Sequence, residues 1–137
     1  MSRSPWIGVV VLGVYLASCA SNVPVSEAEY STAIVGRWQG VVGDLKEGLT
    51  INGDGTFVCQ LHPTGFIANT LSQSATGTIR GTWNIAGTTI TLRVNSAENE
   101  RLRYLIASST IVAFKADTLV LKSDRGESST FRRAMAL

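Results

Sequence analysis

The sequence predicts an all-β fold, a small antiparallel up-and-down β-barrel of about eight strands. Apolar and polar residues alternate through most of the chain after Gly36, most cleanly at Ile90, Leu92 and Val94. Short turn signals separate the alternating segments, and Asn52-Gly53-Asp54-Gly55 is the strongest of them. A helical pattern occurs once, near the N-terminus. Together these observations favour a meander of strands over a mixed fold.

The alternating segments define the expected strands. The stretch from Leu102 to Phe114 fits either two strands, 102–107 and 110–114, or one strand broken by Ser108-Ser109. A sheet built this way has two free edges unless it closes on itself, so a barrel is the expected arrangement. The other strands are expected at Val35–Val42, Leu49–Ile51, Thr56–Leu61, Ile79–Ile85, Ile90–Val94, Thr118–Lys122 and Ser128–Arg133.

The N-terminal residues have the pattern of a secretory signal peptide. Arg3 supplies a positive charge, and the apolar run from Trp6 to Ala17 is shorter than the roughly 20 residues that span a bilayer. The run ends in Leu16-Ala17-Ser18-Cys19, which resembles the lipobox of bacterial lipoproteins. The resemblance implies cleavage before Cys19 and acylation of its thiol, with palmitate among the attached acyl chains. A plain signal peptide is the alternative interpretation.

This N-terminus divides the chain into a lipoprotein signal peptide (1–18), a lipidated tether (19–25) and a barrel domain (26–137). Ser26 and Glu29 fit a capping box, which predicts one short helix from Glu27 to about Ile34. No aspartate follows Cys19. By resemblance to the sorting of Gram-negative lipoproteins, we expect anchoring to the outer membrane, facing the periplasm. In a Gram-positive source the anchor would lie in the plasma membrane.

Charge and cysteine content exclude several classes of protein. The 12 basic and 10 acidic residues nearly balance, which argues against a nucleic-acid partner. Of the two cysteines, Cys19 is the expected acylation site, so Cys59 has no partner for an intramolecular disulfide. Cys59 alternates with Phe57 and Leu61, so we expect it to be buried in the core.

The residues that could carry chemistry are few. The single histidine, His62, lies at a strand end before Pro63, and no Gly-x-Ser-x-Gly motif accompanies it. We therefore expect no enzymatic activity, no cofactor and no metal site. The segment 62–76 is the only long connection. Its three large apolar residues, Phe66, Ile67 and Leu71, suggest that it folds over one mouth of the barrel.

Several short motifs together resemble the small bacterial lipocalin-like (calycin-type) lipoproteins. They are Gly36-Arg37-Trp38, the segment 52–57, Gly81-Thr82-Trp83 and the terminal Phe131-Arg132-Arg133. In that family a Gly-x-Trp on the first strand packs against a basic residue from the last strand. The resemblance implies that Gly36 and Trp38 close one end of the barrel beneath Arg132 or Arg133, of which only one can face inward.

The resemblance also implies the function. It predicts a lipid-anchored envelope protein that binds a small apolar ligand inside the barrel. Phe66, Trp83, Tyr104 and Phe114 are the candidate ligand-binding residues. The alternative is a filled barrel that acts as an interaction or inhibitor protein on an unidentified protein partner. Four arginines could then form a docking surface instead of an ordinary solvated exterior: Arg80, Arg93, Arg101 and Arg103.

Overall fold

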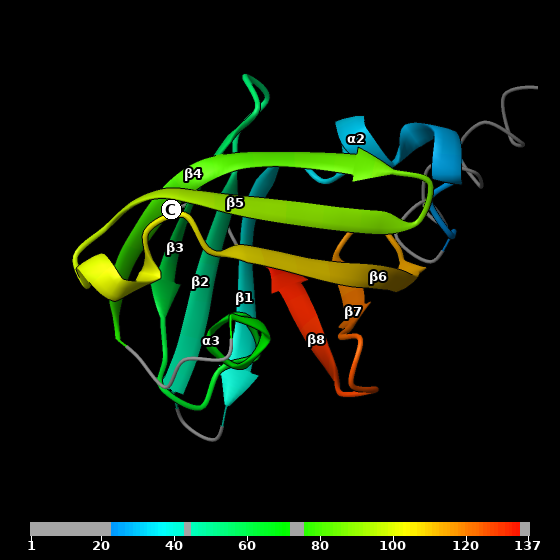
Figure 1. Cartoon of the computed structure of the whole chain (residues 1–137). Coiled ribbons are helices and arrows are strands. Elements are labelled where there is room, and N and C mark those ends of the chain that lie inside the picture. Colours follow the sequence, from blue (N-terminus) through cyan, green and yellow to red (C-terminus); the bar gives the residue numbers. More distant parts are fainter. Residues whose placement is uncertain (1–22, 43–44, 72–75, 135–137) are drawn as a thin grey trace, which may run out of the picture.

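The computed structural model describes residues 23–42, 45–71 and 76–134. Its eight antiparallel strands each pair with their neighbours in chain order, and β1 also pairs with β8, so the sheet closes into a barrel (Figure 1). The predicted fold class is therefore confirmed. The predicted signal peptide and Cys19 lie outside the described residues. No helix within the described ranges is long and apolar enough to cross a membrane.

Most strands lie where the alternation places them. The turn at Asn52–Gly55 joins β2 to β3, and Gly55 there has a φ of +93°, which favours glycine. Asp54 Oδ1 accepts hydrogen bonds from the Thr56 N–H and hydroxyl, which fixes the turn. The strands are β1 Gly36–Val42, β2 Leu45–Ile51, β3 Thr56–Leu61, β4 Gly77–Ala86, β5 Thr89–Ala97, β6 Ile106–Phe114, β7 Thr118–Lys122 and β8 Ser128–Arg133.

The stretch 102–114 fitted either two strands or one broken strand, and the structure forms a single strand there, β6, from Ile106 to Phe114. β6 runs unbroken through Ser108 and Ser109, which pair with Thr91 and Ile90 of β5. Ser109 faces inward and is buried, so the two serines continue the alternation instead of ending it. The expected strand at 102–107 was wrong in its first half, because Leu102 ends a short 3-10 helix, η3 (Glu100–Leu102), that precedes β6.

The predicted N-terminal helix is split into a 3-10 turn, η2 (Glu27–Glu29), and a single α-helical turn, α2 (Tyr30–Ala33). The Ser26 hydroxyl donates to the Glu29 carboxylate at 2.8 Å instead of capping a backbone N–H. A second short helix, α3 (Phe66–Thr70), lies in the connection between β3 and β4. Figure 1 shows α2 and α3 at opposite ends of the barrel.

These two ends are called the base and the mouth. At the base, beside α2, β1 begins and β6 ends at Phe114. At the mouth, beside α3, β3 ends and β4 begins. Pro24 forms a β-bridge with Lys115, and the Val25 N–H donates to the Phe114 carbonyl at 2.8 Å. Both residues therefore lie against the end of β6 at the base.

Candidate functional site

The base is closed by Trp38, which is 1% exposed. Its indole N–H donates to the Ile34 carbonyl at 2.8 Å, and its ring meets the edge of Phe114 at 5.9 Å. The Arg133 guanidinium lies 4.2 Å from the centre of the Trp38 ring. A cation in this position over an indole contributes about 0.5–2 kcal/mol. The aromatic cluster and the guanidinium therefore seal this end of the barrel.

Strand register decides which arginine takes this position. Trp38 pairs directly with Arg133 across β1 and β8, and directly opposed residues share one face of a sheet. Arg132 points outward and is exposed. Arg133 also donates to the backbone carbonyls of Ala33, Val35 and Ala116. Gly36, with φ +141°, leaves room for it, because a Cβ at this position would overlap the guanidinium.

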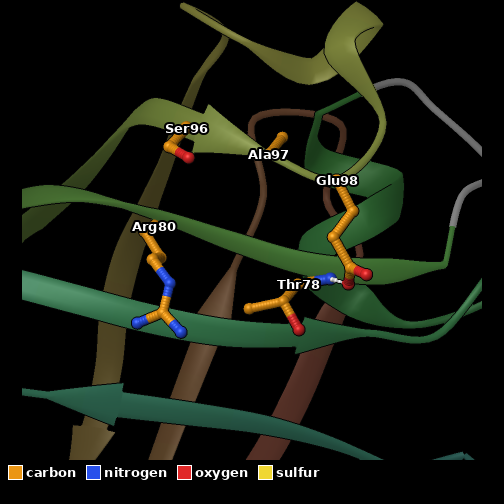
Figure 2. A pocket seen from close by; sticks show the side chains of 5 residues that line it. All are labelled: Thr78, Arg80, Ser96, Ala97 and Glu98. Atoms are coloured by element: carbon orange, nitrogen blue, oxygen red, sulfur yellow. Dashed lines mark hydrogen bonds between the residues drawn. The ribbon is translucent and has the colours of Figure 1, made fainter.

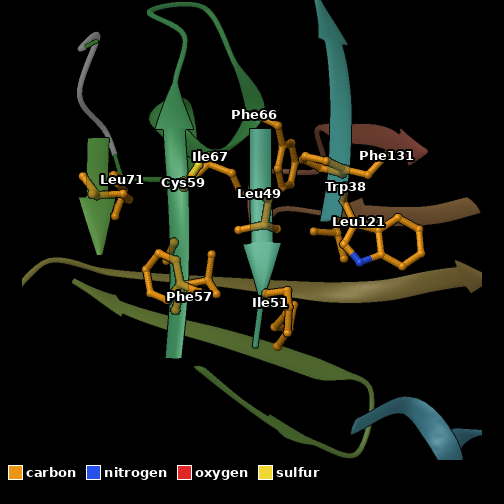
Figure 3. Close-up of a cluster of buried hydrophobic side chains, with 14 of the residues drawn as sticks. Trp38, Leu49, Ile51, Phe57, Cys59, Phe66, Ile67, Leu71, Leu121 and Phe131 are labelled. Carbon is orange, nitrogen blue, oxygen red and sulfur yellow. The ribbon is translucent and has the colours of Figure 1, made fainter. Parts of the chain in front are cut away.

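Buried side chains from every strand and from α3 form one hydrophobic core cluster in the interior. Figure 3 shows ten labelled residues of this cluster converging between the strands. Among the described residues, no buried side-chain nitrogen or oxygen lacks a hydrogen-bond partner. Cys59 is fully buried as expected, and burial raises the pKa of its thiol, so the sulfur stays protonated and unreactive. The interior thus presents packed apolar surface instead of free polar groups.

The mouth is covered by α3, as expected for the long connection. Phe66, Ile67 and Ala68 of this helix are buried, and so is Leu71 at its C-terminal end. The Phe66 ring meets the edge of Phe131 at 6.1 Å, which joins the helix to the barrel core. The sequence alone indicated a cover but not a helix, because five helical residues are too few to show a 3.6-residue period.

A buried carboxylate holds α3 in place. Glu47 on β2 is 1% exposed and accepts hydrogen bonds from the backbone N–H groups of Ile67 (2.8 Å), His62 (3.3 Å) and Ala68 (3.4 Å). Glu47 is not among the functional residues predicted from the sequence. The sequence did contain a sign of its role. Glu47 lies two residues before Leu49 and four before Ile51, so it faces inward with them, and an acidic residue at an inward position needs hydrogen-bond partners.

Deprotonation of Glu47 is expected to weaken the closure of α3. Burial raises the pKa of the Glu47 carboxyl above its ordinary value of 4.5, while the backbone hydrogen bonds and nearby His62 lower it in part. Exposure on opening would return the pKa toward the ordinary value. The closed state therefore binds the proton more tightly, and the closure loses stability as the pH rises from 4.5 through the folded pKa.

The measurement is hydrogen exchange at the Ile67 and Ala68 amides over a pH series, corrected for intrinsic exchange rates. The opening free energy should fall with rising pH in the native chain. It should stay constant in Glu47→Gln, which has no ionisable group at this position. A pH-independent opening in the native chain would contradict the expectation.

The four candidate ligand-binding residues do not converge. Phe66 lies at the mouth, whereas Phe114 lies at the base beside Trp38 and Tyr30. Trp83 is half-buried, and its indole N–H donates to the Asn52 carbonyl at 2.9 Å beside the β2–β3 turn. These three positions are spread along the barrel, so they do not line one common site.

The prediction that Tyr104 faces the interior was wrong. Its side chain is 73% exposed. The Val94 N–H donates to the Leu105 carbonyl, and the Tyr104 N–H donates to the Val94 carbonyl. Tyr104 and Leu105 therefore both lie opposite Val94. Counted back from buried Ala107 and Ser109, Tyr104 falls on the outer face with exposed Ile106 and Ser108, and a bulge forms where the chain meets β5. The first residue of this bulge takes a left-handed conformation, and Tyr104 accordingly has a φ of 68°.

The outer surface of β4 and β5 carries a hollow of about 410 Å³. Figure 2 shows its polar lining, in which the Arg80 and Glu98 side chains extend side by side with Thr78 between them. The Glu98 carboxylate is already occupied, because it accepts a hydrogen bond from the Thr78 N–H. Arg93, Arg101 and Arg103 are exposed, as expected for outward positions. The lining residues are Thr78, Arg80, Ser96, Ala97 and Glu98.

Comparison with known proteins identifies the fold. No protein-family model matches the chain, and no curated protein matches it in sequence. A lipocalin-like protein from Bacteroides thetaiotaomicron is 21% identical with a TM-score of 0.52, over 74% of this chain and 97% of that one. A lipocalin-like protein from Bacteroides uniformis is 14% identical with a TM-score of 0.51, over 74% and 99%. The chain is therefore similar to lipocalin-like proteins in its fold.

Proposed function

We propose that this chain is a lipid-anchored protein of the bacterial envelope that binds a partner through the outside of a filled barrel. The proposal rests on the core cluster, because its side chains, which come from every strand and from α3, are at most 7% exposed, whereas ligand pockets offer open apolar space. The proposed role is non-catalytic. Within the described ranges, no three His, Cys, Asp or Glu side chains are grouped so that they could hold a metal ion. The anchor is Cys19 in its lipobox context, with the outer membrane and the periplasm as the expected location.

Tyr104 supports a role for the outer surface. It is the only non-glycine residue with positive φ among those described. The Arg103 guanidinium lies 5.0 Å from the centre of its ring and donates to its hydroxyl at 2.9 Å. Buried Leu102 holds the loop against the core. Strained residues concentrate at functional sites, and tyrosine and arginine dominate the energetics of protein interfaces, so we place the contact surface here.

Photo-crosslinking in intact cells tests this surface. A photoreactive phenylalanine analogue replaces Tyr104 in one variant and Thr130, an exposed residue on β8, in the control. We expect a discrete crosslinked product from position 104 and none from position 130. Equal labelling at both positions, or none at either, would count against the proposal.

A small apolar ligand beneath α3 is the second candidate. It is favoured by the way α3 is attached, through the Glu47 carboxylate and the contact between Phe66 and Phe131. Lifting this helix would expose the apolar interior. Native mass spectrometry of protein extracted from membranes, with a dye-displacement titration, separates the two candidates. A stoichiometric bound molecule that the dye displaces would favour this candidate over the filled barrel.

A further inference from the structure

The base of the barrel carries a small exposed apolar surface beside the point where the described chain begins. Val23 is 54% exposed and Val35 is 37% exposed. Pro24, next to Val23, is bridged to Lys115, and the Arg133 side chain joins the backbones of Val35 and Ala116. These contacts bring the five residues together on one side of the base. We call this surface the anchor face: Val23, Pro24, Val35, Lys115 and Ala116.

The length of chain between Cys19 and the anchor face limits how far the base can stand from a membrane. Five Cα–Cα steps separate Cys19 from Pro24, and fully extended they span at most about 18 Å. The polar headgroup layer of one leaflet takes up about 5–8 Å of this distance. An acyl group on Cys19 therefore keeps the base close to the headgroups.

The charges around the anchor face match an uncharged phospholipid surface. Three cationic side chains lie near this end, exposed Lys115 and Arg37 and partly buried Arg133, and three carboxylates offset them: Asp117, Glu27 and Glu29. A strongly basic face would be needed to select anionic lipids. The exposed valines and this balanced charge instead suit the polar–apolar boundary of a bilayer.

We infer that the anchor face rests on the phospholipid headgroup layer and that the α3-covered mouth points away from the bilayer. The inference rests on the proposed acylation of Cys19. In this orientation Tyr104, in the connection between β5 and β6 at the mouth end, is presented to the aqueous compartment. The membrane is then the partner of the base, and a soluble or envelope partner is left to the rest of the outer surface.

Depth-dependent fluorescence quenching tests the orientation with the full-length acylated protein. An environment-sensitive dye is attached to Val35→Cys or Ala116→Cys at the base, and to Asp124→Cys in the exposed β7–β8 turn at the mouth as a matched control. Buried Cys59 does not compete for the dye. The protein is reconstituted in vesicles of the uncharged phospholipids phosphatidylethanolamine and phosphatidylcholine that contain headgroup spin-labelled lipid.

We expect a blue shift and strong quenching at positions 35 and 116, and neither at position 124. Equal quenching at all three positions, or stronger quenching at 124, overturns the orientation. Flotation of the native and Cys19→Ser proteins with the same vesicles reports the anchor separately. If the native protein floats but positions 35 and 116 are unquenched, the orientation alone fails. If the native protein does not float, the anchor and the orientation both fail.

Discussion

Replacing Trp38 by alanine is expected to lower the free energy of unfolding by about 3–5 kcal/mol. The indole is almost completely buried, donates to the Ile34 carbonyl, and packs between Phe114 and the Arg133 guanidinium. Truncation of the indole leaves a cavity at the base and removes the hydrogen-bond donor to the Ile34 carbonyl. A domain of this size is stable by only about 5–15 kcal/mol, so this single loss is a large fraction of the total.

Urea denaturation measures this effect. Arg132→Ala is the matched control, because Arg132 neighbours Arg133 on β8 but is exposed and should change stability by no more than about 0.5 kcal/mol. A double-mutant cycle of Trp38→Phe with Arg133→Met then isolates the coupling of the two side chains. A loss below about 1 kcal/mol for Trp38→Ala would show that the base is not sealed by packing.

Replacing Gly65 by alanine is expected to loosen α3 and to destabilise the chain by about 1–3 kcal/mol. The backbone at Gly65, with φ −73° and ψ 163°, suits alanine, so the expected effect is steric. A Cβ at this position would overlap the carboxylate of Glu47. The carboxylate or the helix must then move, and the hydrogen bonds from Ile67 and Ala68 to Glu47 lengthen or break.

Denaturation and hydrogen exchange at the Ile67 amide together measure the result. Gly53→Ala is the matched control, because a Cβ there meets open space in the β2–β3 turn. If the carboxylate is the cause, Gly65→Ala should cost less in a Glu47→Ala background, which shows as non-additive free energies. Equal costs in both backgrounds would mean that the added Cβ does not act by displacing the Glu47 carboxylate.

The two ends of the barrel are closed by different physical means. At the base, a guanidinium and aromatic rings form a seal that does not depend on the protonation of a carboxyl group. At the mouth, a five-residue helix is held by a buried carboxylate whose pKa is raised, together with one aromatic contact. The mouth is therefore the end more able to open, which is why a ligand beneath α3 is the second candidate function.

The sequence by itself determined the features that depend on local pattern. Alternation with period two identified the strands, and it placed Phe57, Cys59 and Leu61 on the inward face of β3. Turn chemistry at Asn52–Gly55 located a hairpin. The segment Leu16-Ala17-Ser18-Cys19, which resembles a lipobox, is also a property of the chain alone, and it supports the proposed anchor without any knowledge of the fold.

Only the tertiary structure decided the features that depend on register and on packing between distant segments. The β1–β8 register selects Arg133 over its neighbour, since a shift of one residue exchanges the two faces of a strand. The inward face of β6 is set by Ala107 and Ser109, which leaves Tyr104 on the outer face with Ile106. Glu47 meets α3 across about 20 intervening residues, and the filled interior arises from the contributions of every strand. None of these contacts can be read from a segment in isolation, because each is set by how the barrel closes.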